Sequence, residues 1–157
     1  LLANALVAAG CDLLLCETFP HIGEGLAAVE AAAATGAEVW VSFTAGYKAD
    51  LLTPNEIVEG ARRAVDRGAS AVLVNCIPAK ETLRYLRPLA AIGVPFGAYA
   101  NAGHPDDGLG WVSTDQGPAR YADIAQTWVD LGATLIGSCC GTSPRTTAEL
   151  ARRFSTP

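Results

Sequence analysis

A glycine followed by a short apolar run occurs five times along this chain of 157 residues. The five segments cover residues 10–17, 36–43, 68–76, 93–99 and 132–137. Each run is apolar on both of its faces, which is typical of a parallel β-strand covered by helices. A glycine in front of each run suits the left-handed residue that closes a preceding helix. The pattern therefore predicts a fold built from repeated helix and strand units.

The segments between these runs have the composition and the start signals of helices. They cover residues 22–35, 55–67, 80–92, 119–131 and 145–154. The second begins with Thr53-Pro54-Asn55-Glu56, a capping box with proline at the first helical position. Pro88 is expected to end or kink the third helix early. Strand and helix alternate throughout, which predicts an α/β fold with a parallel sheet and right-handed crossovers.

Two architectures fit this alternation, an open doubly wound sheet and part of a (β/α)₈ barrel. No Gly-x-Gly-x-x-Gly follows the first run, which disfavours a dinucleotide-binding sheet. A barrel carries its chemistry at the carboxyl ends of its strands, and polar or thiol residues end all five runs here. A complete barrel takes about 200–250 residues. We therefore interpret residues 1–157 as the C-terminal part of a single (β/α)₈ TIM barrel, its last five βα units, with the first three absent.

The composition excludes several classes of protein. Half of the residues are hydrophobic and 17% are charged, as in globular domains and unlike disordered chains. The net charge of −5 argues against binding to nucleic acid or to an anionic membrane. No apolar run reaches the roughly 18–20 residues of a membrane span, and no signal peptide is recognisable. Five cysteines in a chain that needs no disulfide staples favour a reducing compartment, so we expect a cytoplasmic location.

Three of the cysteines follow strand-like runs. Cys76 ends one run, and the adjacent Cys139 and Cys140 follow another, between Gly137 and Gly141. Adjacent cysteines do not readily form a disulfide with each other, whereas three thiols at strand ends can hold a soft metal. Zn²⁺ binds thiolates at about 2.3 Å, and a catalytic zinc keeps three protein ligands and one open position. The pattern therefore predicts a Zn²⁺ site made by Cys76, Cys139 and Cys140.

The other cysteines and the histidines are interpreted differently. Cys11 and Cys16 lie in no ligand motif and are expected to fill space in the core. His21 and His104 are expected on solvated loops and not on a metal. The longest loop, residues 101–117, is interpreted as either a functional lid or a disordered segment. Trp111 within it either packs over a substrate or anchors the loop locally.

Several motifs of the chain resemble those of the homocysteine S-methyltransferases. This family includes the betaine- and S-methylmethionine-dependent enzymes and the homocysteine module of cobalamin-dependent methionine synthase. The matching segments, in family order, are Glu17-Thr18-Phe19-Pro20, Ser42-Phe43, Val74-Asn75-Cys76, Tyr99-Ala100-Asn101-Ala102-Gly103 and Gly137-Ser138-Cys139-Cys140-Gly141-Thr142-Ser143-Pro144. The resemblance implies an enzyme that moves a methyl group from S-methylmethionine, S-adenosylmethionine or betaine to the thiol of homocysteine, forming methionine.

The resemblance also implies roles for individual residues. Cys76, Cys139 and Cys140 would be the zinc ligands, and Glu17 would hold the amino-acid part of homocysteine. The positions of Asn75, Tyr99 and Asn101 in the matched motifs imply further contacts with the substrate. Local roles stay open for three of these residues: Glu17 as a partner of a helix N-terminus, Tyr99 as a packed ring, and Asn75 as the residue that orients its own turn.

Departures from the family pattern and two rival interpretations remain. The family often has Tyr-Pro-Asn at Tyr99-Ala100-Asn101 and a second glycine at Ser138. Its acidic Asp-Gly motif has no counterpart here, so we expect activity to depend on the missing N-terminal half or on a homo-oligomer. One rival is a phosphate-binding barrel, with Gly141-Thr142-Ser143 at a helix N-terminus. The other is an inactive or split fragment whose open strand edges pair with another chain.

Overall fold

One parallel β-sheet organises the chain, which the computed structural model describes over residues 2–112 and 114–155. Its strands are β1 (Leu13–Phe19), β2 (Glu38–Phe43), β3 (Ala71–Pro78), β4 (Phe96–Asn101) and β5 (Leu135–Ser138). They lie in the order β1-β2-β3-β4-β5, and every neighbouring pair is parallel. All five predicted strands are therefore present, and the predicted α/β class is confirmed.

Helices connect the strands and differ from the expected segments only at their ends. They are α1 (Leu2–Ala8), α2 (Ile22–Ala33), α3 (Pro54–Val65), α4 (Ala79–Leu89), the 3₁₀ turn η1 (Pro105–Asp107), α5 (Gly117–Asp130) and α6 (Pro144–Phe154). The capping box at Thr53 and Glu56 is present. Helix α4 ends at Leu89, earlier than the expected residue 92, and Pro88 lies inside its last turn, beyond which the Ala90 amide still donates to the Leu86 carbonyl. Helix α1 is an addition to the five expected.

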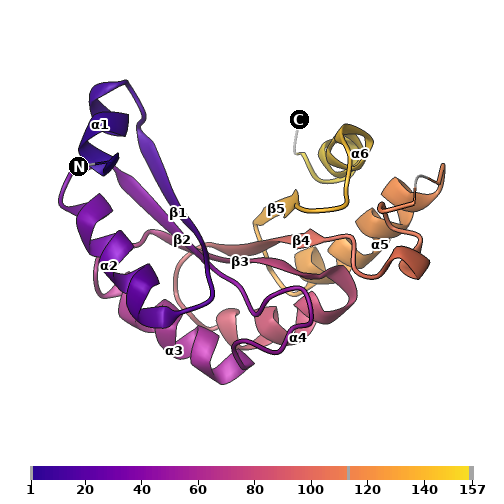
Figure 1. The fold of residues 1–157 in the computed structure, drawn as a ribbon, viewed down its shortest axis with the longest axis horizontal. Helices are drawn as coiled ribbons and strands as arrows, with labels where there is room; N and C mark the ends of the chain where they lie inside the picture. The colour runs from indigo at the N-terminus through magenta and orange to yellow at the C-terminus, as the bar shows by residue number, and fades with distance from the viewer. Residues whose placement is uncertain (1, 113, 156–157) are drawn as a thin grey trace.

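The order of the strands distinguishes part of a (β/α)₈ barrel from an open doubly wound sheet. A doubly wound sheet reverses its strand order at a switch point and carries helices on both faces, whereas consecutive barrel strands follow one another with helices on the outside only. In Figure 1 helices α2 to α5 lie along one side of the sheet, and the opposite side faces an open space between α1 and α6. The structure thus has the arrangement of consecutive barrel units, as the predicted partial barrel requires.

The hydrophobic core fills the layer between the sheet and these helices. Val41 and Phe43 of β2 and Val72 of β3 are fully buried there. On the side of α5, the rings of Tyr121 and Trp128 meet edge to face with centroids 5.9 Å apart. Each fully buried aliphatic or aromatic side chain contributes about 1.5–3 kcal/mol. This layer therefore fixes the positions of the strand ends that carry the candidate site.

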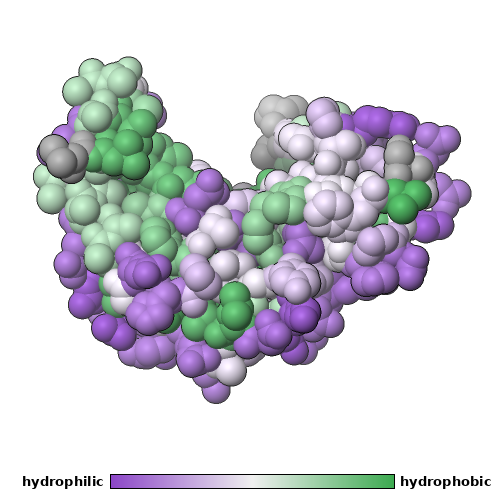
Figure 2. Space-filling model, viewed as in Figure 1, coloured by the Kyte–Doolittle hydropathy of each residue, from purple (hydrophilic) through white to green (hydrophobic). Residues whose placement is uncertain are grey.

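The other face of the sheet is concave and partly polar. Because side chains alternate along a strand, the buried Val41 and Phe43 leave Trp40 and Ser42 on the concave side. Strands β1 and β5 are the edges of the sheet, and Leu15 of β1 is 40% exposed. Figure 2 shows apolar residues gathered over α1 and β1, and a hollow between this end of the molecule and the other.

Two further findings concern membranes and the remaining cysteines. Within residues 2–112 and 114–155, every helix is too short or too polar to cross a bilayer. Cys16 packs against the core, as expected. Cys11 is exposed, so the expectation that it fills the core was wrong. It lies in the turn between α1 and β1, where the apolar pattern of the strand has not yet begun.

Candidate metal centre and its cavity

Two pairs of neighbouring strands shift their pairing register near the carboxyl end of the sheet, where the candidate site lies. The break between β1 and β2 falls between Cys16 and Phe19, and the break between β3 and β4 falls between Asn75 and Pro78. Inside these breaks Thr18 and Cys76 have φ angles of 68° and 51°. A left-handed backbone is costly for a residue with a side chain and persists only where surrounding contacts enforce it. The breaks redirect both side chains at the carboxyl end of the sheet.

The side chain of Asn75 connects three strands beside these breaks. Its Oδ1 accepts a hydrogen bond of 2.6 Å from the Ser42 hydroxyl of β2. Its Nδ2 donates one of 2.7 Å to Thr18 Oγ1 of β1. Asn75 is 1% exposed and its bond to Ser42 is buried away from competing water, whereas Thr18 is exposed. The network ties the left-handed Thr18 to the residue that immediately precedes Cys76.

A second set of hydrogen bonds holds the thiol-bearing segments together. The Asn101 side chain donates to the Cys76 carbonyl at 2.9 Å and accepts from the Gly103 amide at 2.7 Å. Beyond the end of β5, the Cys139 amide donates to Ala100 and the Cys140 carbonyl accepts from Ala102. The strand pairing of β4 with β5 thus continues past the sheet and places both adjacent cysteines beside Cys76.

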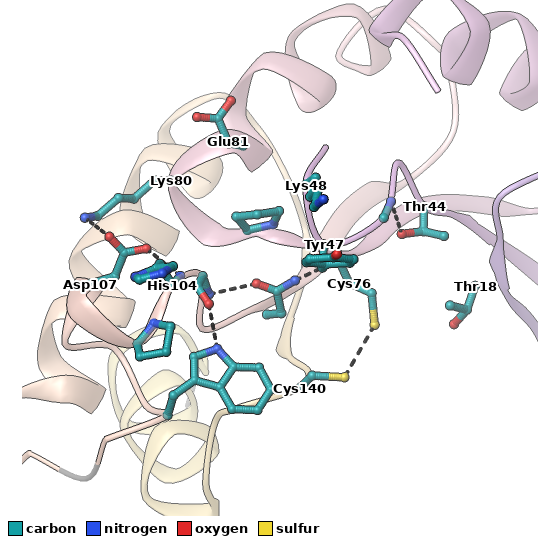
Figure 3. A pocket seen from close by; sticks show the side chains of 16 residues that line it. Thr18, Thr44, Tyr47, Lys48, Cys76, Lys80, Glu81, His104, Asp107 and Cys140 are labelled. Atoms are coloured by element: carbon teal, nitrogen blue, oxygen red, sulfur yellow. Dashed lines mark hydrogen bonds and ion pairs between the residues drawn. The ribbon is translucent and has the colours of Figure 1, made fainter. Parts of the chain in front are cut away.

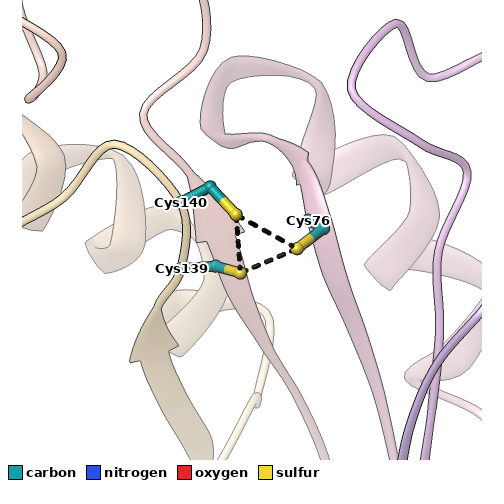
Figure 4. Close-up of side chains that lie close together, drawn as sticks. All are labelled: Cys76, Cys139 and Cys140. Atoms are coloured by element: carbon teal, nitrogen blue, oxygen red, sulfur yellow. Dashed lines mark hydrogen bonds between the residues drawn. The ribbon is translucent and has the colours of Figure 1, made fainter.

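The three sulfur atoms form a triangle (Figure 4). Cys76 Sγ lies 2.7 Å from Cys139 Sγ and 3.8 Å from Cys140 Sγ, and Cys139 Sγ lies 3.7 Å from Cys140 Sγ. All three are free thiols. Tetrahedral thiolate ligands at about 2.3 Å from zinc would be separated by about 3.8 Å. Two of the three separations match that edge, so the cluster fits a zinc ion after a small outward movement of one sulfur.

A bound cation would reverse the protonation preference of the clustered thiols. Burial raises the pKa of the Cys76 thiol, and the neighbouring Cys139 and Cys140 thiols raise it further. Burial also raises the pKa of Cys139. Without a cation the raised pKa keeps the Cys76 and Cys139 thiols protonated at neutral pH. A divalent metal ion reverses this preference, because it removes the proton from a coordinating thiol.

Glu17 and Tyr99 meet on the concave face of the sheet. The Tyr99 hydroxyl donates a hydrogen bond of 2.9 Å to Glu17 Oε2, which joins β4 to β1 across the intervening strands. Burial raises the pKa of Tyr99, and the Glu17 carboxylate raises it further. Glu17 lies inside β1, two residues before its end, and is exposed. Its carboxylate therefore stands where a ligand in the hollow could reach it.

A cavity of about 940 Å³ opens beside the thiols. Its wall includes Cys76 and Cys140, the loop after β2 with Tyr47, and the segment after β4 with Trp111. In Figure 3 the sulfurs of Cys76 and Cys140 face each other at one end, and Lys80 and Asp107 lie at the other. A volume of roughly 300–1,000 Å³ is typical of sites for small ligands. The cavity can hold a molecule of metabolite size in contact with the thiols.

The segment after β4 packs directly on the turn that carries the adjacent cysteines. A Cβ atom added at Gly141 would lie 2.4 Å from Trp111 Cε2, and one added at Gly110 would lie 2.0 Å from the Gly141 carbonyl oxygen. The Trp111 indole donates to the Gly103 carbonyl at 2.6 Å. Both glycines are therefore required for this close approach. Trp111 anchors its loop and also lines the cavity.

The structure thus brings together the residues singled out in the sequence, in two groups. Cys76, Cys139 and Cys140 form the one cluster of three potential metal ligands within residues 2–112 and 114–155. Glu17 and Tyr99 form a hydrogen-bonded pair. His21 and His104 are exposed and lie outside the cluster, as expected.

Asn75 and Asn101, which were also predicted to contact the substrate, are buried residues. Both side chains are buried and satisfied by bonds within the protein, so direct contact between either of them and a substrate stays a prediction.

Sequence reasoning missed several residues of the site. Thr18 and Ser42 were quoted only as parts of motifs, yet both are hydrogen-bond partners of Asn75. Their position at the ends of neighbouring strands was the available signal, since parallel strands end at the same edge of a sheet. Tyr47 and Lys80 gave no such signal, because loop residues reach the cavity through tertiary packing alone.

Comparison with known proteins identifies a protein family whose members this chain resembles. The family model for homocysteine S-methyltransferase matches residues 2–154. The chain is 35% identical to the homocysteine S-methyltransferase of Escherichia coli (strain K12), over 96% of the chain and 50% of that protein. It is 32% identical to homocysteine S-methyltransferase 1 of Arabidopsis thaliana, over 95% of the chain and 48% of that protein.

One solved structure of a homocysteine methyltransferase is also similar to this chain. The crystal structure of the homocysteine methyltransferase MmuM from Escherichia coli, in its oxidized form, matches with a TM-score of 0.72 and 31% identity. The match covers 96% of this chain and 48% of that one. The chain spans about half the length of the curated relatives it matches. Because the family model matches residues 2–154, we conclude that the chain belongs to the homocysteine S-methyltransferase family.

Proposed function

We propose that this chain carries the metal and homocysteine site of a homocysteine S-methyltransferase, within the C-terminal part of one (β/α)₈ domain. The observation that supports the proposal most strongly is the triangle of sulfur atoms at the carboxyl ends of β3 and β5, beside a cavity of about 940 Å³. The relatives carry this activity in their names and are about twice as long. The reducing conditions that free thiols need agree with a cytoplasmic location.

Cys76, Cys139 and Cys140 would hold a Zn²⁺ ion through their thiolates. A zinc ion with three protein ligands supplies an open position that binds the homocysteine thiol and favours its deprotonated form. Glu17 would accept hydrogen bonds from the ammonium group of homocysteine, and Tyr99 would hold the Glu17 carboxylate in place through their 2.9 Å bond. Asn75 and Asn101 would position the thiols indirectly. Asn75 bonds to Thr18, and Asn101 bonds to the Cys76 carbonyl.

The proposed reaction balances without a redox partner. The homocysteine thiol proton leaves to solvent, and the thiolate sulfur forms a bond to the methyl carbon of the donor. The bond between that carbon and the donor heteroatom breaks, and both of its electrons stay on the heteroatom. In S-methylmethionine, S-adenosylmethionine and betaine that heteroatom is a positive sulfonium sulfur or ammonium nitrogen, and it becomes neutral when the bond breaks.

The test measures zinc content and homocysteine binding in the chain and its variants. We expect one zinc per chain, and loss of both zinc and homocysteine binding in Cys139→Ser. Cys11→Ser is the matched control, because Cys11 is exposed and outside the cluster. Glu17→Gln is expected to keep its zinc and to bind homocysteine more weakly. Full zinc occupancy in Cys139→Ser would contradict the proposal.

A further inference from the structure

Two exposed aromatic side chains line the cavity that contains the thiols. Tyr47 is 74% exposed and Trp111 is 51% exposed, although large apolar rings are usually buried in a domain of this kind. Both belong to the wall that also includes Cys76 and Cys140. Rings this exposed on a cavity wall can still be reached by a ligand in the cavity.

Trp111 is held in a fixed orientation next to the metal ligands. Its indole N–H donates to the Gly103 carbonyl at 2.6 Å, and its six-membered ring packs on Gly141, the residue after Cys140. A side chain fixed in this way loses little conformational freedom when a ligand binds.

The Tyr47 loop is likewise fixed. Its Ala49 carbonyl accepts hydrogen bonds from Arg84 Nη2 at 2.8 Å and from the Tyr85 hydroxyl at 2.9 Å. The Lys48 ammonium lies 5.4 Å from the centroid of the Tyr47 ring, so this ring already accepts a cation. Both aromatic walls of the cavity are therefore set before any ligand arrives.

The negative charge that would attract a cation comes from the metal-loaded thiolates, because the cavity wall itself also carries the Lys48 ammonium. Among its described lining residues, Asp107 is paired with Lys80 at 2.5 Å and Glu81 with Arg84 at 3.4 Å. These carboxylates are already neutralised by partners. Three thiolates around one divalent ion carry a net charge of −1, and a bound homocysteine thiolate makes it −2. Such a centre attracts a positive ligand, and aromatic faces bind one without a counter-charge.

We propose that Trp111 and Tyr47 form the binding site for the onium group of the methyl donor, a sulfonium or quaternary ammonium cation. The proposal rests on the proposed function for the identity of the ligand as a donor. The chemistry agrees with it, because transfer of a methyl group from a positive heteroatom to a thiolate leaves that heteroatom neutral. The two rings are thus specificity-determining residues that hold the cation beside the sulfur nucleophile.

The experiment titrates the zinc-loaded chain with trimethylsulfonium and follows its methyl resonance by ¹H NMR. tert-Butanol, which is similar in size and neutral, is the matched probe, and tetramethylammonium tests the second onium class. We expect both cations to bind at least about tenfold more tightly than tert-butanol. Trp111→Leu and Tyr47→Leu are each expected to weaken sulfonium binding about 3- to 30-fold. Trp111→Phe and Tyr47→Phe should retain most of it.

Two further variants sharpen the result. Trp40→Leu is the matched control, because Trp40 lies on the concave face of β2 and is not part of the cavity wall. It is expected to bind sulfonium as the parent chain does. Lys48→Met removes the cation that lies over Tyr47 and is expected to strengthen sulfonium binding, since both competition and repulsion are lost.

The outcomes separate this inference from the proposed function. Equal affinity for trimethylsulfonium and tert-butanol would overturn the inference, and so would unchanged sulfonium binding in both leucine variants. Zinc content and homocysteine binding are measured on the same samples and report on the proposed function alone. Because Tyr47 is 74% exposed on a loop, Tyr47→Leu leaves the core intact and keeps the test decisive if Trp111→Leu unfolds.

Discussion

Asn75→Ala should destabilise the fold much more than an ordinary asparagine substitution. The change removes the hydrogen bonds to Ser42 and to Thr18, at 2.6 and 2.7 Å. Each is worth about 1 kcal/mol net, and the Ser42 hydroxyl, which is 0% exposed, then loses its acceptor at a cost of about 1–3 kcal/mol. The expected loss in the free energy of unfolding is about 3–5 kcal/mol. In a chain of this size that lowers the melting temperature by roughly 6–20 °C.

The assay is urea unfolding of the zinc-free chain, followed by circular dichroism, with thermal unfolding as a second measure. Asn55→Ala is the matched control, because Asn55 is exposed on the first turn of α3. Its effect should stay within about 0.5 kcal/mol. A double-mutant cycle with Ser42→Ala should give a coupling energy of about 1 kcal/mol. If Asn75→Ala cost no more than Asn55→Ala, or if the cycle were additive, the proposed network would not support the strand ends.

Three shorter predictions concern the cysteine turn, the thiols and pH. Gly141→Ala should destabilise the chain more than Gly36→Ala. Both glycines have a positive φ, but only an added Cβ at Gly141 meets Trp111, at 2.4 Å. A shift in indole fluorescence in the Gly141 variant alone would report the displacement of Trp111. Cys76→Ser should lower zinc affinity by orders of magnitude, whereas Cys16→Ser should leave it unchanged, as measured by competition with a chromophoric chelator. Burial raises the pKa of Cys76 and Cys139 above the ordinary 9.0, so the folded state holds these protons more tightly than the unfolded chain. The metal-free chain should therefore lose stability as the pH rises above about 9, and the Cys76→Ser, Cys139→Ser double variant should lose less of it in urea unfolding.

Much of the fold could be predicted because its signals are local and repeated. Five apolar runs, each preceded by a glycine, predicted the strands, and the capping box at Thr53 and Glu56 predicted a helix start. The meeting of Cys76 with Cys139 and Cys140 follows from topology, since parallel strands end at one edge. That these thiols bind zinc stays a prediction.

The rest of the site depends on tertiary contacts that no local pattern records. The left-handed Thr18 and Cys76 lie at register breaks stabilised by side chains from other strands. Trp111 reaches the cysteine turn only because Gly110 and Gly141 allow the two loops to touch. Glu17 was expected at a strand end but lies within β1, because the strand continues through its break to Phe19.

The central claim is that three thiols hold a metal ion to which the homocysteine sulfur adds as a fourth ligand. X-ray absorption at the zinc edge of the metal-loaded chain tests it most directly, before and after addition of homocysteine. The account predicts three sulfur ligands at about 2.3 Å before addition and four afterwards. A metal with fewer than three sulfur ligands, or a coordination shell that homocysteine leaves unchanged, would contradict the account.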